Sequence, residues 1–192
     1  VTSTLAHETR NSVSAIGGFA GLLKRKHCGG TELGRYLDML LDESKKLEQL
    51  IEGILKAAHK TEPHFEKVNP NEILEELKAL TQEKARLSNV KIKEEKQLFS
   101  KSIFVDKESV LVALKEIVMN AVEASPKNGE VLMKIDQEEE WVVISVIDQG
   151  QGMDEQTLRR IYEPLFSTKK LSAGLGLSFA KGLIEAQNGY IR

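Results

Sequence analysis

The sequence predicts an α+β protein in which an antiparallel helical hairpin is followed by a two-layer α/β sandwich. Three observations lead to this fold class. A heptad repeat of apolar residues runs from position 33 to 58, helices and short strands alternate from position 69, and glycine-rich segments follow the last strand. We expect a hairpin over residues 1–60, a linker over 61–68 and a sandwich over 69–192.

Composition excludes several classes of protein. The chain has 192 residues, enough to bury a core, and a formal net charge of −2, so no broad basic field recruits nucleic acid. The single cysteine, Cys28, can form no internal disulfide and has no companions at zinc-ligand spacing, which suits a reducing compartment. No apolar run approaches the ~18 residues that span a bilayer and no signal peptide is visible, so we expect no membrane contact within these residues.

The first helix is expected from Leu5 to about Lys26, and Thr31 can cap a second helix after a turn at 27–30. Three glycines in the first helix each cost roughly 1 kcal/mol relative to alanine, so packing must hold it. The heptad positions of the second helix are Leu33, Leu37, Leu40, Ser44, Leu47, Ile51, Ile54 and Ala58. Such a hairpin leaves apolar surface uncovered. A second copy would cover it in a dimeric four-helix bundle, and the alternative is packing against residues 70–192.

The sandwich begins at Asn69, which is predicted to cap a helix with Ile73, Leu77 and Leu80 on one face. Short strands are expected near 90–92 and 103–105, and Asp106 then caps another helix. The predicted core stripe of that helix is Val110, Leu114, Ile117 and Ala121, broadened by Leu111, Val118 and Val122.

Off that stripe, Glu116, Asn120 and Glu123 are spaced at i, i+4 and i+7. Such a row is usually a solvated polar face. The functional interpretation is that Asn120 supplies a neutral oxygen ligand to Mg²⁺, which prefers hard oxygen donors. Glu116, one turn earlier, could then orient or deprotonate an attacking group.

Two strands are expected next, at Val131–Ile135 and Trp141–Ile147, and the second runs into the motif Asp148-Gln149-Gly150-Gln151-Gly152. The motif could be a mere tight turn. An aspartate at a strand end can also accept a hydrogen bond from an exocyclic amine, while glycines let the backbone approach a flat base. Further on, Gly174 and Gly176 open an amphipathic helix, whose free N–H groups would favour a phosphate. Neither a P-loop nor a dinucleotide-binding fingerprint is present.

His7 is expected on the surface of the first helix, with Arg10 and Asn11 on the same face and Glu8 about 100° away. A neutral imidazole is a nucleophile near neutral pH, and a carboxylate partner can raise its basicity. By itself His7 could equally be an ordinary surface histidine.

Taken together and in this order, these blocks resemble the cytoplasmic core of a sensor histidine kinase of a two-component system. The motifs that carry the resemblance are an H-box over residues 5–11, an N-box over 116–124, a first glycine box over 148–152, an F-box over 166–169 and a second glycine box over 174–177. The resemblance implies a dimeric phosphotransfer hairpin over 1–60 and a gyrase/Hsp90-like ATP-binding domain over 69–192, in the cytoplasm of a bacterium.

The resemblance also implies roles for single residues. The γ-phosphoryl group of Mg·ATP is expected to pass to His7, polarised by Glu8, and then to an aspartate on the receiver domain of a response regulator. Asn11 is expected to place the water that dephosphorylates that regulator. The residues expected around ATP are Asn120 at Mg²⁺, Asp148, Gly150 and Gly152 at the base, and Lys169, Gly174 and Gly176 at the phosphates.

The sequence departs from the family pattern at several points. Ser12 replaces a proline that bends the first helix in many members, and Ser172-Ala173 precede Gly174 in a lid where another glycine is frequent. Glu116 stands where bacterial histidine kinases often have asparagine, and the related gyrase-type ATPases use glutamate there to activate water. Two alternatives therefore stay open: a gyrase-type ATP-hydrolysing clamp and a non-catalytic dimeric docking scaffold.

Overall fold

The computed structural model describes residues 2–27, 32–58, 63–96, 102–169, 172 and 174–192. The chain divides into two compact units. The hairpin unit comprises Val1–Thr61 and Glu163–Leu175, and the sandwich unit comprises Glu62–Tyr162 and Gly176–Arg192.

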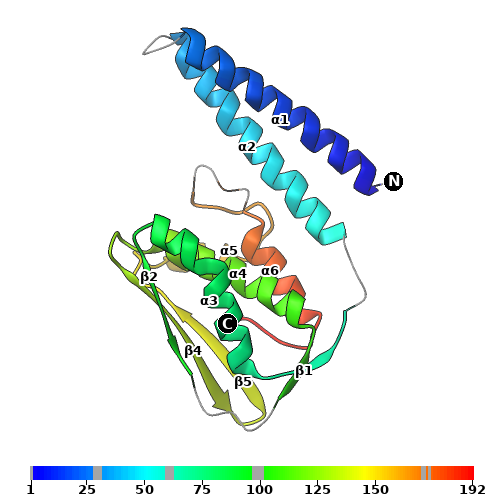
Figure 1. The fold of residues 1–192 in the computed structure, drawn as a ribbon, viewed down its shortest axis with the longest axis vertical. Coiled ribbons are helices and arrows are strands. Elements are labelled where there is room, and N and C mark those ends of the chain that lie inside the picture. The colour runs from blue at the N-terminus through cyan, green and yellow to red at the C-terminus, as the bar shows by residue number, and fades with distance from the viewer. Residues whose placement is uncertain (1, 28–31, 59–62, 97–101, 170–171, 173) are drawn as a thin grey trace. The chain divides into compact units, whose positions relative to one another are not determined.

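Two long helices form the hairpin unit, α1 (Thr2–His27) and α2 (Glu32–Ala58), and they run side by side in opposite directions (Figure 1). Their mutual contact contains a buried polar group, because the Ser44 hydroxyl donates a hydrogen bond of 2.8 Å to the carbonyl oxygen of Val13. Gly17 makes room for it, since an added Cβ there would lie 2.8 Å from Ser44 Oγ. The turn was predicted at residues 27–30, but His27 still belongs to α1, and residues 28–30 lie outside the described part of the chain.

The heptad of α2 divides between two faces of the helix. Leu37, Ser44 and Ile51 are buried in the hairpin, whereas Leu33, Leu40 and Leu47 are exposed. The exposed apolar side chains of α1 are Ile16, Phe19, Leu22 and Leu23. Apolar residues thus remain uncovered on both helices, as a four-helix bundle requires. Among the described residues, no helix is long and apolar enough to cross a membrane.

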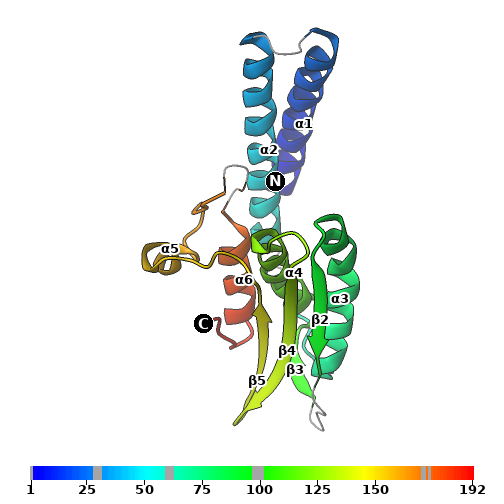
Figure 2. The same ribbon diagram turned by 90° about the vertical axis from the view of Figure 1, so that its left-hand side faces the viewer.

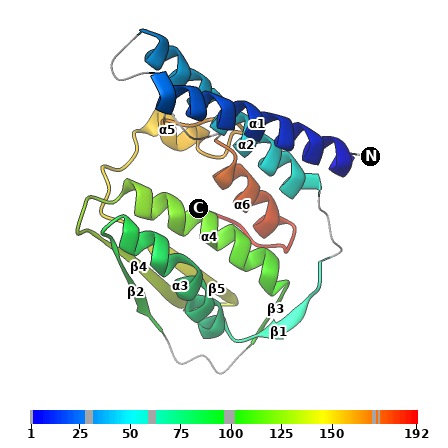
Figure 3. The ribbon, with the colours of Figure 1, turned by 45° about the horizontal axis from the view of Figure 1, so that its top comes forward.

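The sandwich unit has helices on one side of a mixed sheet (Figures 2 and 3). Strand β2 (Lys91–Glu95) pairs in parallel with β4 (Glu130–Glu138), which pairs antiparallel with β5 (Trp141–Ile147). Its three larger helices are α3 (Pro70–Leu87), α4 (Lys107–Ala124) and α6 (Gly176–Glu185). A short helix, α5 (Glu155–Arg160), follows β5. The predicted α+β class, a helical hairpin followed by an α/β layer structure, is confirmed.

Helices α3 and α4 pack their apolar faces on β4, whose inward side chains Val131, Met133 and Ile135 are fully buried. Of the three residues predicted to share one face of α3, Ile73 and Leu77 are fully buried, whereas Leu80 is 53% exposed. Leu74 and Thr81 take the inward positions instead, and the Thr81 hydroxyl donates a 2.7 Å hydrogen bond to the carbonyl of Leu77. Because this polar side chain satisfies itself within the helix, it can lie in the core.

The predicted linker, residues 61–68, contains a strand that the sequence pattern did not indicate. Strand β1 (Glu66–Val68) pairs antiparallel with β3 (Ile103–Val105) in a separate two-stranded sheet. Only Val68 of β1 is buried, so three residues give no alternating pattern to recognise. The pairing depends on a partner distant in sequence, which local propensity cannot reveal.

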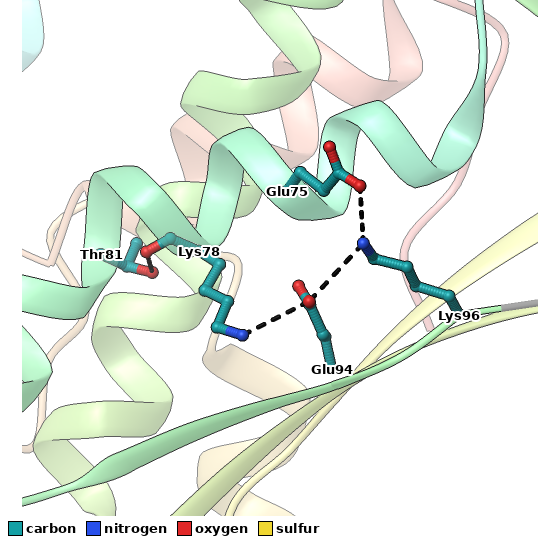
Figure 4. Close-up of polar contacts among 5 residues, drawn as sticks. All are labelled: Glu75, Lys78, Thr81, Glu94 and Lys96. Atoms are coloured by element: carbon teal, nitrogen blue, oxygen red, sulfur yellow. Dashed lines mark hydrogen bonds and ion pairs between the residues drawn. The ribbon is translucent and has the colours of Figure 1, made fainter.

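A charged network joins the outer face of α3 to strand β2 (Figure 4). Lys78 and Lys96 lie 3.3 Å and 3.6 Å from Oε1 of Glu94, and Lys96 also contacts Glu75 at 2.6 Å. The hydrogen bond with Glu75 raises the pKa of Lys96, while the same bond lowers the pKa of Glu75. Glu75 and Lys96 are exposed, whereas Lys78 and Glu94 are half-buried, so solvent screens the Glu75–Lys96 pair most strongly.

Candidate functional site

The polar face of α4 forms one wall of the candidate site. Asp106 caps the helix by accepting a hydrogen bond of 3.1 Å from the backbone N–H of Ser109. Glu116 and Asn120 follow on one face and are half-buried, whereas Glu123 is exposed. Half-burial distinguishes the first two from a freely solvated row, and it leaves them accessible to a ligand.

The turn after β5 lies against the C-terminal end of α4. Oδ1 of Asp148 accepts a 2.7 Å hydrogen bond from the N–H of Gly150, and Oε1 of Gln149 accepts one of 3.0 Å from the N–H of Glu130. An added Cβ on Gly150 would lie only 2.8 Å from the carbonyl oxygen of Ala124, which is four residues beyond Asn120. The turn therefore places Asp148 next to the helix end that carries Asn120.

The first turn of α6 forms the other wall. An added Cβ on Gly176 would lie 2.8 Å from Oε2 of Glu116, so the start of α6 lies directly beside this carboxylate. The first turn of a helix presents backbone N–H donors at the positive end of the helix dipole. One side of the sandwich unit thus brings together five of the predicted site residues, namely Glu116, Asn120, Asp148, Gly150 and Gly176.

Gly152 continues the turn beyond Gly150 with a φ of +71°, in the left-handed region where a side chain is strained. Nothing lies within 4 Å of the position that its Cβ would occupy. The glycine is therefore needed for the backbone conformation and not to avoid a collision.

The F-box loop belongs to the hairpin unit and has its own closure. The N–H of Leu165 donates a 3.0 Å hydrogen bond to the carbonyl of Gly174, and an added Cβ on Gly174 would lie 2.4 Å from the carbonyl oxygen of Phe166. Gly174 also has a φ of +66°. Lys169 is exposed, and its N–H donates to Ser167 Oγ at 3.1 Å. That Lys169 and Gly174 contact phosphate stays a prediction.

The predicted phosphoacceptor segment lies in α1. His7, Glu8 and Asn11 all belong to this continuous helix, so Asn11 follows His7 by about one turn on the same face. The side chains of these three residues lie outside the described part of the structure.

Sequence reasoning missed several supporting residues. The carbonyl of Ala124 lies close against Gly150, and Gln149 accepts a hydrogen bond from the N–H of Glu130 in β4. Helix α5 was also missed, although Asp154 caps it by accepting from Thr157 N–H at 2.7 Å. An aspartate three residues before threonine was the available signal. Among the described residues, no three His, Cys, Asp or Glu side chains gather as metal ligands.

Replacing Gly150 with alanine tests the close contact between this turn and the end of α4. The added Cβ would collide with backbone, so the turn must move, and we expect a loss of about 1–3 kcal/mol in the free energy of unfolding together with weaker ATP binding. Urea denaturation and calorimetry measure both. Gly182→Ala is the matched control on α6, where nothing lies within 4 Å and alanine should stabilise by up to ~1 kcal/mol. If the two variants have the same free energy of unfolding and the same ATP affinity, the close contact between the turn and α4 is contradicted.

Comparison with known proteins decides the family. Residues 1–63 match the His Kinase A phospho-acceptor domain, and residues 105–192 match the histidine kinase-, DNA gyrase B- and HSP90-like ATPase domain. The chain belongs to the histidine kinase family. The order of the two matches follows the order of the hairpin and the sandwich, with the N-box, first glycine box and second glycine box inside the second match.

Similar histidine kinases extend along nearly the whole chain. Sporulation kinase A of Bacillus subtilis (strain 168) is 31% identical over 97% of this chain and 30% of its own length. Sporulation kinase C of the same strain is 29% identical over 98% of this chain and 44% of its own length. The crystal structure of histidine kinase ThkA in complex with response regulator protein TrrA has 29% identity and a TM-score of 0.69 over 98% of this chain and 55% of that one. The chain thus spans less than half the length of these two sporulation kinases.

Proposed function

We propose that this kinase core transfers the γ-phosphoryl group of ATP to His7 and then to an aspartate on the receiver domain of a response regulator. The observation that carries the proposal is the gathering of Glu116, Asn120, Asp148 and Gly176 on one side of the sandwich unit, in a chain whose first helix holds His7. The complex of ThkA with a response regulator supports the second transfer.

The residues present fit a bound nucleotide and Mg²⁺. Gly150 lets the turn after β5 approach the end of α4, and Gly176 lets the start of α6 approach the carboxylate of Glu116, so that acceptor and donor groups suited to a nucleotide lie on one side of the sandwich unit. With Oδ1 of Asp148 held by Gly150, the second carboxylate oxygen remains for the adenine amino group. Asn120 would hold Mg²⁺ through its amide oxygen. When bound, Mg²⁺ neutralises phosphate charge and helps align the phosphoryl group for transfer.

The other roles follow from charge and position. N–H groups at Gly176, with those at Gly174 and the ammonium of Lys169, would donate to the phosphates. Glu8 would polarise His7 and raise the basicity of its attacking nitrogen. Gly152 would allow the first glycine box to lie flat against the base.

We propose a homodimer as the working form, with the exposed apolar stripes of α1 and α2 as its interface. Leu40 and Phe19, 51% and 67% exposed, are typical of the side chains that a second hairpin would bury. We further propose that this core works in the cytoplasm of a bacterium and has no nucleic-acid partner.

A gyrase-type ATPase is the second candidate, because Glu116 lies beside the start of α6, where a carboxylate could activate water. Incubation with γ-labelled ATP decides between the two functions. Acid-labile label on the protein is the result expected of a histidine kinase. Free phosphate without labelled protein would identify an ATPase. If neither labelled protein nor free phosphate forms, the chain is a non-catalytic docking scaffold.

Glu116→Gln tests the role of this carboxylate. If Glu116 orients or deprotonates the attacking imidazole, the amide should slow phosphorylation of His7 by about 10²–10⁴-fold, the usual contribution of a general base. Its affinity for ATP should change little. Single-turnover labelling at saturating Mg·ATP measures the rate. An unchanged rate would show that Glu116 takes no part in the transfer.

Asn11→Ala tests a phosphatase activity toward the regulator. An amide can orient water but is a poor base, so its contribution should be positional. Autophosphorylation of His7 should persist, while loss of phosphate from the regulator slows. Both rates are measured on one preparation, with the melting temperature as control. Equal loss of both activities, or an unchanged phosphatase rate, would contradict the assignment.

A further inference from the structure

Asp106 joins three segments of the sandwich unit. Its carboxylate, in a residue only 8% exposed, accepts hydrogen bonds from the N–H of His64 at 3.2 Å and from the N–H and hydroxyl of Ser109 at 3.1 Å each. Its own N–H donates to Oε1 of Gln187 at 2.7 Å. Gln187 follows α6 and donates from Nε2 to the carbonyl of Leu183 at 3.4 Å. One side chain therefore holds the start of α4 and the chain that enters from the hairpin.

The charge of this carboxylate is needed for these contacts. Burial raises the pKa of Asp106, but the hydrogen bonds from Ser109 and His64 outweigh burial, and the net shift is downward. A carboxamide at this position has a single oxygen, so it could not accept from His64 at one oxygen and from the N–H of Ser109 at the other.

From His64 onward, the entering chain is attached to the sandwich unit. The ring of Phe65 stacks on Phe104, with centroids 5.7 Å apart and planes at 25°. Strand β1 then pairs with β3, beside which it lies in Figure 3. Residues 59–63 alone separate Ala58, at the end of α2, from the anchor at His64. Fully extended, five residues reach at most about 18 Å.

We propose that Asp106 is a positioning residue for phosphorylation of His7. Its hydrogen bond with the N–H of His64 limits the linker between the hairpin and the sandwich unit to residues 59–63. The inference rests on the proposed function. When a flexible tether can span its two sites, effective concentration falls roughly as the −3/2 power of its length. Release of residues 64 and 65 would lengthen the linker from about five to about seven residues and lower the effective concentration by about 1.7-fold. Release of β1 as well would lower the effective concentration by about threefold.

Asp106→Asn separates the anchor from the helix cap. Asparagine caps helices as well as aspartate does, but its NH₂ group cannot accept a hydrogen bond. We expect the amide of His64 to lose hydrogen-exchange protection. We also expect single-turnover phosphorylation of His7 at saturating Mg·ATP to fall by about 1.7-fold, or by about threefold if β1 is released as well, with ATP affinity by calorimetry unchanged.

Two control variants isolate the effect. Ser109→Ala removes only the hydroxyl bond to Asp106, and Asp154→Asn removes a carboxylate from the exposed cap of α5. Both should phosphorylate His7 at the parent rate. The inference is overturned if Asp106→Asn keeps protection at His64, or loses it at an unchanged rate. It is also overturned if ATP affinity falls in proportion to the rate, which is the mark of a structural cap. Absence of label on the parent chain would instead overturn the proposed function.

Discussion

Replacing His7 with glutamine is expected to reduce protein labelling by γ-labelled ATP to background. The imidazole provides the nucleophilic nitrogen, and a carboxamide of similar length is not a nucleophile at neutral pH. ATP affinity should stay at the parent value, because His7 lies in α1 and the predicted nucleotide residues Asn120 and Asp148 lie in the sandwich unit. Labelling kinetics and calorimetry on the same preparation measure the two quantities.

His27→Gln is the matched control, since this second histidine ends the same helix at a distance of 20 residues from His7. It should label like the parent. Label persisting on His7→Gln at the parent rate would remove His7 as the acceptor, whereas loss of labelling in both variants would point to a general failure of the hairpin.

Asp148→Asn is expected to weaken ATP binding by roughly 10- to 150-fold. A hydrogen bond to a charged group is worth about 1.5–3 kcal/mol, and the carboxamide offers NH₂ where the second carboxylate oxygen would accept from the adenine amine. The turn itself should survive, because the remaining amide oxygen can still accept from the N–H of Gly150, as Oδ1 does at 2.7 Å. Titration calorimetry with Mg·ATP measures the affinity.

Glu140→Gln provides the comparison for a lost surface charge. Glu140 is exposed in the turn before β5, at the end of the strand opposite Asp148. Its loss should leave affinity within about twofold of the parent, because exposed charges are screened by solvent and salt. If both variants bind ATP equally well, the base-binding role of Asp148 is wrong.

The predictable parts of the fold are those whose signal is local. The cap at Asn69 was recognised from that residue and the three that follow it, and the cap at Asp106 from its place before a helical pattern. Each side chain accepts a backbone N–H of the helix that it caps. The strand before Asp148 was recognised from its apolar run, which ends at Ile147 as predicted. In each case a few neighbouring residues determine the outcome.

The parts that could not be predicted depend on residues far apart in the sequence. Strand β1 needs β3 as a partner, and the anchor at Asp106 needs His64 and Gln187, which are 42 and 81 positions away. The candidate site gives another example. The order of the motifs suggested a common pocket, but it did not reveal the close contact between Gly150 and Ala124. Spacing can name candidate residues, whereas their contacts depend on the packed fold.

The position of the phosphoryl group on the labelled parent chain tests the central claim most directly. Trypsin cleaves after Arg10, so the peptide that ends at Arg10 contains His7 together with serine and threonine. After incubation with Mg·ATP, mass spectrometry should find phosphate on this peptide, attached at His7, and the label should disappear in acid and survive base. Phosphate on any other peptide, or acid-stable phosphate on a hydroxyl of this one, would contradict the account.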